Sequence, residues 1–153
     1  WFIATTCFFF SVQAVDDLYR MFLGMLHVAI PSTFRDPFRS HTVGEFWSER
    51  WNLVIQQLLK DGVAKPLRRR GYSRRAAMLA TFFASGLLHV VPLHMSPRRS
   101  TWGTLSMVLF FVVQVVLISI EHAWGVHGRL WLFVCWLGTV GLFLEPILHI
   151  ADM

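Results

Sequence analysis

The stretch WGTLSMVLFFVVQVVLISI, residues 102–120, decides the fold class. It contains no charged side chain, and as an α-helix with a rise of about 1.5 Å per residue it is long enough to cross a hydrocarbon core of about 30 Å. Two further stretches have the same character: AAMLATFFASGLLHVVPLHM at 76–95 and RLWLFVCWLGTVGLFLEPILHI at 129–150. They predict two more membrane-spanning helices, the last of which we expect to break near its end at Glu145-Pro146.

The composition of the whole chain agrees with these spans. Of the 153 residues, 55% are hydrophobic and 15% are charged, and the mean hydropathy is +0.52. A soluble domain carries about 25% charged residues, and one of about 150 residues buries only about 70% of the surface of its unfolded chain. The remaining apolar surface must face lipid or other protein. We therefore predict an all-α fold, a polytopic transmembrane helical bundle formed by one membrane domain.

The N-terminal part contains two apolar segments, 1–15 and 18–30, which are separated only by Asp16 and Asp17. One long helix with a polar interruption and two shorter helices both fit this pattern. The chain starts within apolar sequence and lacks the basic region and cleavage site of a signal peptide. We expect it to be the C-terminal part of a longer protein that has further helices before residue 1.

The segment 31–75 is strongly polar, with ten Lys or Arg side chains and four Asp or Glu. Such an excess of positive charge places a loop between spans on the cytosolic side of the membrane, where anionic lipid headgroups reinforce the placement. Nucleic acid is the other usual partner of a basic run. The flanking spans argue against it, and we predict no nucleic-acid binding.

Within this loop, residues 42–60 are predicted to form one amphipathic helix. Thr42 and Glu45 have the spacing of a capping box, and Asp61-Gly62 is a typical stop signal. Tryptophans on the apolar side of such a helix favour the membrane interface. The apolar stripe at helical spacing consists of Trp47, Trp51, Val54, Ile55 and Leu58.

A polar stripe runs along the otherwise apolar span 76–95, where Thr81, Ser85 and His89 recur at every fourth residue. Polar and ionisable side chains inside a span are costly and are therefore candidates for function. A histidine with an ordinary pKa near ~6.5 is the natural general base at neutral pH, and Gly86 allows a helix or substrate to approach closely. The structural alternative is that His89 only makes a hydrogen bond with a neighbouring helix.

Two further polar side chains are candidates. Asn52 has an amide that both donates and accepts hydrogen bonds, which suits it to polarise a carbonyl or orient an alcohol; the alternative is the ordinary polar face of an interfacial helix. Glu121 closes the span 102–120 and shares a helical face with Gln114. It either takes part in function or pairs with a basic loop residue. The remaining histidines lack the spacing of metal ligands, so we predict no metal site.

Two separated motifs, in order and spacing, resemble the wax-synthase branch of the membrane-bound O-acyltransferase superfamily: DPFRSHTVGEFWSERWN at 36–52 and TFFASGLLH at 81–89. The family often has Glu directly after the histidine, where this chain has Val90, and a basic or glycine-type residue where it has Glu49. These departures make the chain more similar to fungal wax-synthase-like acetyltransferases of terpenoid secondary metabolism. The matching residues are Pro37, Glu45, Phe46, Trp47, Arg50, Trp51, Asn52, Pro66, Thr81, Phe82, Ser85, Gly86 and His89.

The resemblance implies an enzyme that moves an acyl group, acetyl or fatty acyl, from acyl-CoA to the hydroxyl of a lipophilic alcohol such as a terpenoid or fatty alcohol. It implies that His89 is the general base and that Asn52 orients the thioester or stabilises the oxyanion. The substrate-binding residues that it implies are Trp47, Trp51, Ser85, Glu45, Arg50 and Glu121.

Acyl-CoA is then the co-substrate, and no bound cofactor is expected. The resemblance also implies an integral, multi-pass protein of the endoplasmic reticulum. Five loop arginines are expected to attract the CoA phosphates, although membrane topology alone also explains their presence. They are Arg68, Arg69, Arg70, Arg74 and Arg75.

Two alternatives stay open. Ionisable residues within spans also mark transport pathways, so a non-catalytic transporter or channel component fits the pattern. A catalytically inactive acyltransferase fragment also fits, because the helices that complete the substrate tunnel would precede residue 1. The sequence does not predict an oligomeric state.

Overall fold

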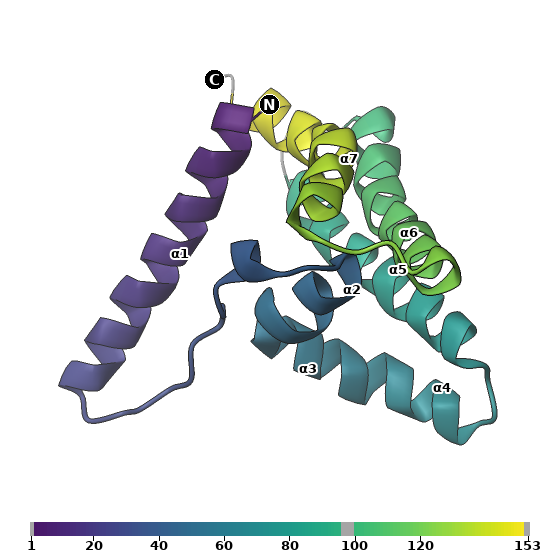
Figure 1. Ribbon diagram of the computed structural model, residues 1–153. Helices are drawn as coiled ribbons and strands as arrows, with labels where there is room; N and C mark the ends of the chain where they lie inside the picture. The colour runs from purple at the N-terminus through teal and green to yellow at the C-terminus, as the bar shows by residue number, and fades with distance from the viewer. Residues whose placement is uncertain (1, 96–99, 152–153) are drawn as a thin grey trace.

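The computed structural model describes residues 2–95 and 100–151, and within them it contains helices and connecting turns but no strand. The three long helices of the C-terminal part are α5 (Arg74–Met95), α6 (Thr101–Trp124) and α7 (Arg129–Ala151). Figure 1 shows them as a bundle in which α6 packs against both α5 and α7. The predicted all-α class is confirmed.

Three helices are long and apolar enough to cross a membrane, namely Arg74–Met95, Thr101–Trp124 and Arg129–Leu148. They correspond to the three predicted spans, with starts and ends shifted by a few residues. Large apolar side chains cover their outward faces, among them Leu87, Leu109 and Leu137. Such a surface is stable against lipid or other apolar helices and unstable in water.

The spans pack through a core shared by α5 and α6. Val90 and Leu93 from α5 lie against Met107, Phe110 and Phe111 from α6. A Cβ atom added to the neighbouring Gly86 would lie 3.2 Å from the Cα of Val108. The predicted role of this glycine, close approach of a neighbouring helix, is confirmed.

The N-terminal segment forms one helix, α1 (Phe2–Met25), which answers the question that the sequence left open. It touches the bundle near its N-terminal end, where the Phe8 and Phe143 rings lie 5.6 Å apart. From there it diverges from the spans (Figure 1), and its Leu18 and Phe22 side chains are exposed.

The loop differs from the prediction of one helix over 42–60. It contains a short turn, η1 (Pro37–Arg39), and then α2 (Val43–Glu45), which continues into the wider helical turn η2 (Phe46–Arg50). The chain breaks at Trp51 and Asn52 and restarts as α3 (Leu53–Leu59), η3 (Lys60–Ala64) and α4 (Lys65–Arg69). The continuous helix 42–60 and its stop at Asp61-Gly62 are therefore both wrong.

Each difference has a local cause. Trp51 is extended and Asn52 takes a left-handed conformation with φ 44°, because the backbone here bonds to an earlier segment: Leu53 N–H donates to the Thr33 carbonyl at 2.9 Å. At Gly62 the helix widens into η3 instead of ending, and an ion pair of 2.5 Å between Lys65 and Asp61 bridges the wide turn.

The ends of the spans follow ordinary capping rules. The Ser73 hydroxyl accepts a hydrogen bond from Ala76 N–H at 3.1 Å at the start of α5, and Gly125, with φ 65°, ends α6. The expected break at Glu145-Pro146 is wrong, because α7 continues through Pro146 to Ala151.

Candidate active site

A cavity of about 1060 Å³ lies between the loop helices and the two spans α5 and α6. Its walls come from α2 to α4 on one side and from α5, α6 and the turn after α6 on the other. The lining includes all the residues that the sequence predicted to form the site except Arg50. These residues are Glu45, Trp47, Trp51, Asn52, Ser85, His89 and Glu121. The structure brings them to one space, and their roles in a reaction stay predictions.

His89 is half-buried on α5 and is held in one orientation. Its Nδ1 lies 2.8 Å from the Ser85 carbonyl oxygen, one turn earlier on the same helix. A carbonyl only accepts, so Nδ1 carries the proton and the lone pair of the neutral ring is on Nε2. The ring packs 4.6 Å from the Phe111 ring and 5.7 Å from the Phe143 ring. Contrary to the structural alternative, this hydrogen bond goes to the histidine's own helix and not to a neighbouring one.

Asn52 lies at the break between η2 and α3, where it caps α3. Its Oδ1 accepts a hydrogen bond from Ile55 N–H at 3.4 Å. Asparagine is among the few residues that tolerate a left-handed conformation, so both the backbone and the cap favour it here. Within the described residues its Nδ2 has no hydrogen-bond partner, which leaves an amide donor beside the cavity.

Two tryptophans form an aromatic wall of the cavity. The Trp47 ring lies 5.8 Å from the Phe111 ring, which also contacts His89. The Trp51 ring stacks on Phe46, with 5.5 Å between centroids and 15° between planes. Phe46 is 1% exposed, so the hydrophobic core fixes this wall from behind.

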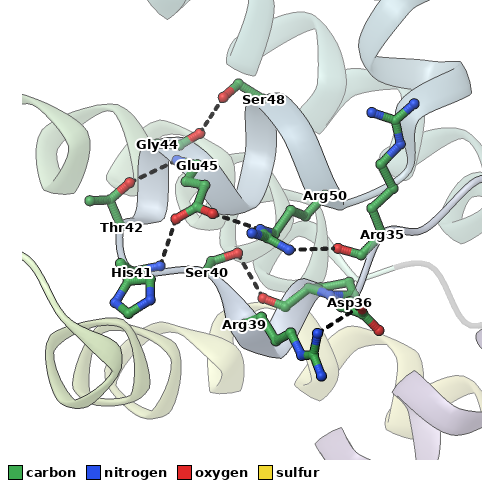
Figure 2. A network of polar contacts seen from close by, with 11 residues as sticks. Arg35, Asp36, Arg39, Ser40, His41, Thr42, Gly44, Glu45, Ser48 and Arg50 are labelled. Atoms are coloured by element: carbon green, nitrogen blue, oxygen red, sulfur yellow. Dashed lines mark hydrogen bonds and ion pairs between the residues drawn. The ribbon is translucent and has the colours of Figure 1, made fainter.

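Glu45 and Arg50 form an ion pair that stabilises the turn (Figure 2). Arg50 Nε donates to Glu45 Oε1 at 2.7 Å, and Arg50 Nη1 donates to the Arg35 carbonyl at 3.2 Å. The other carboxylate oxygen of Glu45 accepts from His41 N–H at 2.7 Å, while Thr42 Oγ1 accepts from Glu45 N–H at 2.9 Å. The predicted capping box thus forms, with its carboxylate bonded one residue earlier than usual. Arg50 points into this network and not into the cavity.

The same contacts change the acidity of Glu45. The hydrogen bond from His41 N–H, assisted by Arg50, holds the pKa of this carboxyl below its ordinary value of 4.5, although partial burial acts in the opposite direction. A lowered pKa means that the ionised form stabilises the folded loop above about pH 4.5, and that this contribution disappears as the pH falls through the folded-state pKa.

We therefore expect Glu45→Gln to lower the free energy of unfolding by about 1 kcal/mol at pH 7, with a smaller loss at pH 3. Thermal unfolding of the full-length protein in detergent at the two pH values measures this difference. Glu49→Gln is the matched control, because Glu49 is exposed on the same segment and makes no ion pair within the described residues. A deficit in the Glu45 variant that is equal at both pH values would contradict the assigned cause.

Glu121 lines the cavity, but its carboxylate is already bonded to protein. It is 8% exposed. Its oxygens accept from Val43 N–H at 2.5 Å, from Gly44 N–H at 3.1 Å and from the Trp131 indole at 2.9 Å. The first two donors belong to the N-terminus of α2, where backbone N–H groups and the helix dipole favour a negative charge. The predicted alternative, in which Glu121 pairs with a basic loop residue, is wrong, because backbone N–H groups bind its carboxylate instead.

The charge of the cavity wall is uneven. Basic side chains from the end of the loop line one part of it, and His89 lines another. His89 comes fifteen positions after Arg74 on α5, a distance of about 22 Å along the helix. The basic lining residues are Lys60, Arg68, Arg74 and Arg75. Arg69 and Arg70, which the sequence could not distinguish from the others, are exposed and are not part of the lining.

Sequence reasoning assigned no site role to three residues that contact side chains of the cavity lining. Phe111 packs on His89, Trp131 binds Glu121, and Gln114 accepts a hydrogen bond from the Trp47 indole at 3.2 Å. Only Gln114 carried a signal, as a polar residue in the middle of an apolar span. In the described part of the chain, no group of three His, Cys, Asp or Glu side chains could hold a metal ion.

Comparison with known proteins shows the family of this chain. The profile of the membrane bound O-acyl transferase family matches residues 30–113, which include the loop helices, His89 and the first half of α6. The chain belongs to this family. As a member of the membrane bound O-acyl transferase family with three apolar helices, it is an integral membrane protein.

Curated relatives of this chain include several proteins of the plant Arabidopsis thaliana. "Probable long-chain-alcohol O-fatty-acyltransferase 2" of Arabidopsis thaliana is 31% identical over 129 residues, which are 76% of this chain and 37% of that protein. "Probable long-chain-alcohol O-fatty-acyltransferase 8" of the same plant is 32% identical over 98 residues, 59% of this chain and 28% of that protein. "Acyl-CoA--sterol O-acyltransferase 1", also from Arabidopsis thaliana, is 26% identical over 120 residues, 74% of this chain and 31% of that protein.

These comparisons support the wax-synthase-like branch of the membrane bound O-acyl transferase family. The chain spans about a third of the length of the curated relatives that it matches. No solved structure matches it.

Proposed function

We propose that this protein transfers an acyl group from acyl-CoA to the hydroxyl of a lipophilic alcohol. The observation that supports the proposal is the shared cavity, whose lining includes both His89, with Nδ1 bonded to the Ser85 carbonyl, and Asn52. Family membership and the names of the relatives support the same reaction class.

In the proposed reaction the alcohol oxygen attacks the carbonyl carbon of the thioester, and Nε2 of His89 takes the hydroxyl proton. The Asn52 amide donates to the carbonyl oxygen while that oxygen carries negative charge. The C–S bond then breaks, the ester is released, and the proton on His89 passes to the CoA thiolate. The wall of Trp47, Trp51 and Phe111 keeps water away from the thioester, which strengthens the electrostatic interactions.

The uneven charge of the cavity supports one orientation of acyl-CoA. Its phosphates lie at the basic part of the wall, and the extended pantetheine arm reaches along α5 towards His89. Charge-assisted hydrogen bonds from guanidinium groups to phosphate are strong and geometrically specific. Of the five arginines expected near the phosphates, the geometry supports Arg68, Arg74 and Arg75, together with Lys60.

We expect Arg74→Gln combined with Arg75→Gln to raise the KM for acyl-CoA about tenfold, which corresponds to the loss of about 1.4 kcal/mol of binding. Arg69→Gln combined with Arg70→Gln removes the same charge from neighbouring exposed positions and is expected to change KM less than twofold. Protease protection of tagged termini verifies that both variants keep their membrane orientation. Equal changes in KM would assign the basic run to topology and not to the substrate.

Two observations bear on the acyl and alcohol classes. The names of the relatives favour a long-chain alcohol or a sterol, whereas Glu49, which resembles the terpenoid acetyltransferases, lines the cavity. Val90, the other departure, is buried against α6 and lies outside the lining. We propose a lipophilic alcohol with acetyl or fatty acyl as the transferred group, and the endoplasmic reticulum as the membrane.

The direct assay uses microsomes from cells that express the full-length protein. They are supplied with labelled acetyl-CoA or palmitoyl-CoA and with a fatty alcohol, a sterol or a terpenoid alcohol, and the labelled ester is identified by mass spectrometry. One ester above the level of untransformed cells identifies both substrates. The absence of any ester with all six pairs would contradict the proposed reaction class for these substrates.

A further inference from the structure

Two buried polar side chains of α6 hold the loop helix against the bundle. The first is Glu121, which binds the backbone N–H groups of Val43 and Gly44 and, on its other side, the Trp131 indole of α7. One carboxylate thus joins the start of α2, the end of α6 and the start of α7. We call this set the Glu121 contact.

The second is Gln114, two helical turns earlier on α6 and 4% exposed. Its Oε1 accepts from the Trp47 indole at 3.2 Å, and its Nε2 donates to Thr139 Oγ1 of α7 at 3.3 Å. The Thr139 hydroxyl in turn donates to the Cys135 carbonyl at 2.8 Å. This set, the Gln114 contact, joins η2 to α6 and α7 at a second level.

Both contacts act on one short rod, residues 43–50. Backbone hydrogen bonds stabilise it along its length. Phe46 N–H donates to the Thr42 carbonyl, and at the end of the rod Trp51 N–H donates to the Phe46 carbonyl. Fixing its start through Glu121 and its middle through Trp47 therefore fixes the place where it ends. Asn52 is the second residue after that end, next to Trp51.

We propose that Glu121 and Gln114 are positioning residues, which hold the rod 43–50 on α6 so that the Asn52 amide and the Trp47 ring face His89. The inference rests on the proposed function for its kinetic consequence, but its structural part can be measured without any activity. It assigns Glu121 an indirect role, since two backbone N–H groups and an indole bind its carboxylate oxygens.

The chain provides a matched control for Glu121. At the opposite end of the same two spans Glu145 of α7 accepts from the Trp102 indole of α6 at 3.3 Å. This is the same pair of residue types between the same helices, and it touches no part of the rod. Ser106 is fully buried on α6, and among the described residues its hydroxyl is bonded only to the Gly103 carbonyl of its own helix; it is the control for Gln114.

The structural test is amide hydrogen exchange of the full-length protein in detergent or nanodiscs. Glu121→Gln and Gln114→Leu should each increase the exchange rate of the segment 43–52 about tenfold, because the rod then opens locally without unfolding the spans. Glu145→Gln and Ser106→Ala should leave the segment at the wild-type rate. Unchanged exchange in both rod variants would overturn the proposal, whether or not the protein transfers acyl groups.

The kinetic test separates positioning from general stability. Each rod variant should lower kcat by about 10²-fold, the typical effect of a displacement of about 1 Å in a catalytic group, and should change the KM for acyl-CoA less than threefold. Combining either variant with Asn52→Asp should lower kcat little further than Asn52→Asp alone, because both changes remove the same amide from the same place.

Losses of kcat that multiply in the double variants would show that the rod residues act independently of Asn52, and would overturn the positioning role. If the wild-type protein makes no ester, the proposed function fails while the exchange result still decides whether the two contacts hold the rod.

Discussion

His89→Ala is expected to lower kcat for ester formation by about 10²–10⁴-fold, the usual contribution of a general base. The reason is geometric: the Ser85 carbonyl holds the proton on Nδ1 at 2.8 Å, which leaves Nε2 as the one basic atom of the imidazole for the alcohol. The initial rate of ester formation in microsomes, corrected for the amount of inserted protein, measures the effect.

His94 provides a matched control for this experiment. It lies on the same helix, its Nδ1 contacts the Val90 carbonyl four residues earlier at 3.2 Å, and it is not part of the cavity lining. His94→Ala removes the same side chain with the same local contact, and we expect wild-type activity. If His89→Ala retained more than a tenth of the wild-type kcat, His89 would not be the base.

Asn52→Asp is expected to lower kcat by about 10²–10³-fold, as loss of one oxyanion donor does. Aspartate keeps the side-chain oxygen that caps α3 and tolerates the left-handed backbone. It lacks the Nδ2–H donor and adds a negative charge, and both changes destabilise a nearby oxyanion. Steady-state kinetics against acyl-CoA measures kcat and KM separately.

Asn52→Gly separates the amide from the backbone. Glycine takes φ 44° without strain and costs only a few tenths of a kcal/mol as a helix cap, so it should fold and should be as inactive as the aspartate variant. Asn52→Ala is less informative, because it adds backbone strain of about 1–2 kcal/mol. Activity in the glycine variant close to wild type would leave Asn52 with a structural role only.

The buried polar contacts also explain why this loop is ordered at the edge of an apolar bundle. A carboxylate buried without partners is strongly destabilising, and Glu121 is compensated by two backbone donors and an indole. Removal of one partner leaves the others unsatisfied, and this asymmetry makes such contacts sensitive to substitution. Hydrogen bonds between transmembrane helices contribute about 0.6 kcal/mol each on average, so the contacts matter more for position than for total stability.

Sequence alone was sufficient for the properties that depend on neighbouring residues. A span is a run of apolar side chains of a certain length, so 76–95, 102–120 and 129–150 could be recognised without any tertiary contact. The excess of basic residues between helices, the caps of the helices, and the periodic stripe that ends in His89 are local in the same sense. The two motifs that resemble the family could also be recognised in the sequence. The match of the family model to residues 30–113, which contain both motifs, confirms the predicted family.

Tertiary structure decided the features that depend on partners far away in the chain. The break at Asn52 follows from backbone bonds to residues 33–35, and Glu121 meets Val43 across 78 positions of sequence. Likewise, Arg74 lines the cavity and Arg70 does not. This difference depends on where each side chain lies in the fold, which composition does not determine. The physical reason is that a buried polar group is stable only beside its partner, and the partner is chosen by packing in three dimensions.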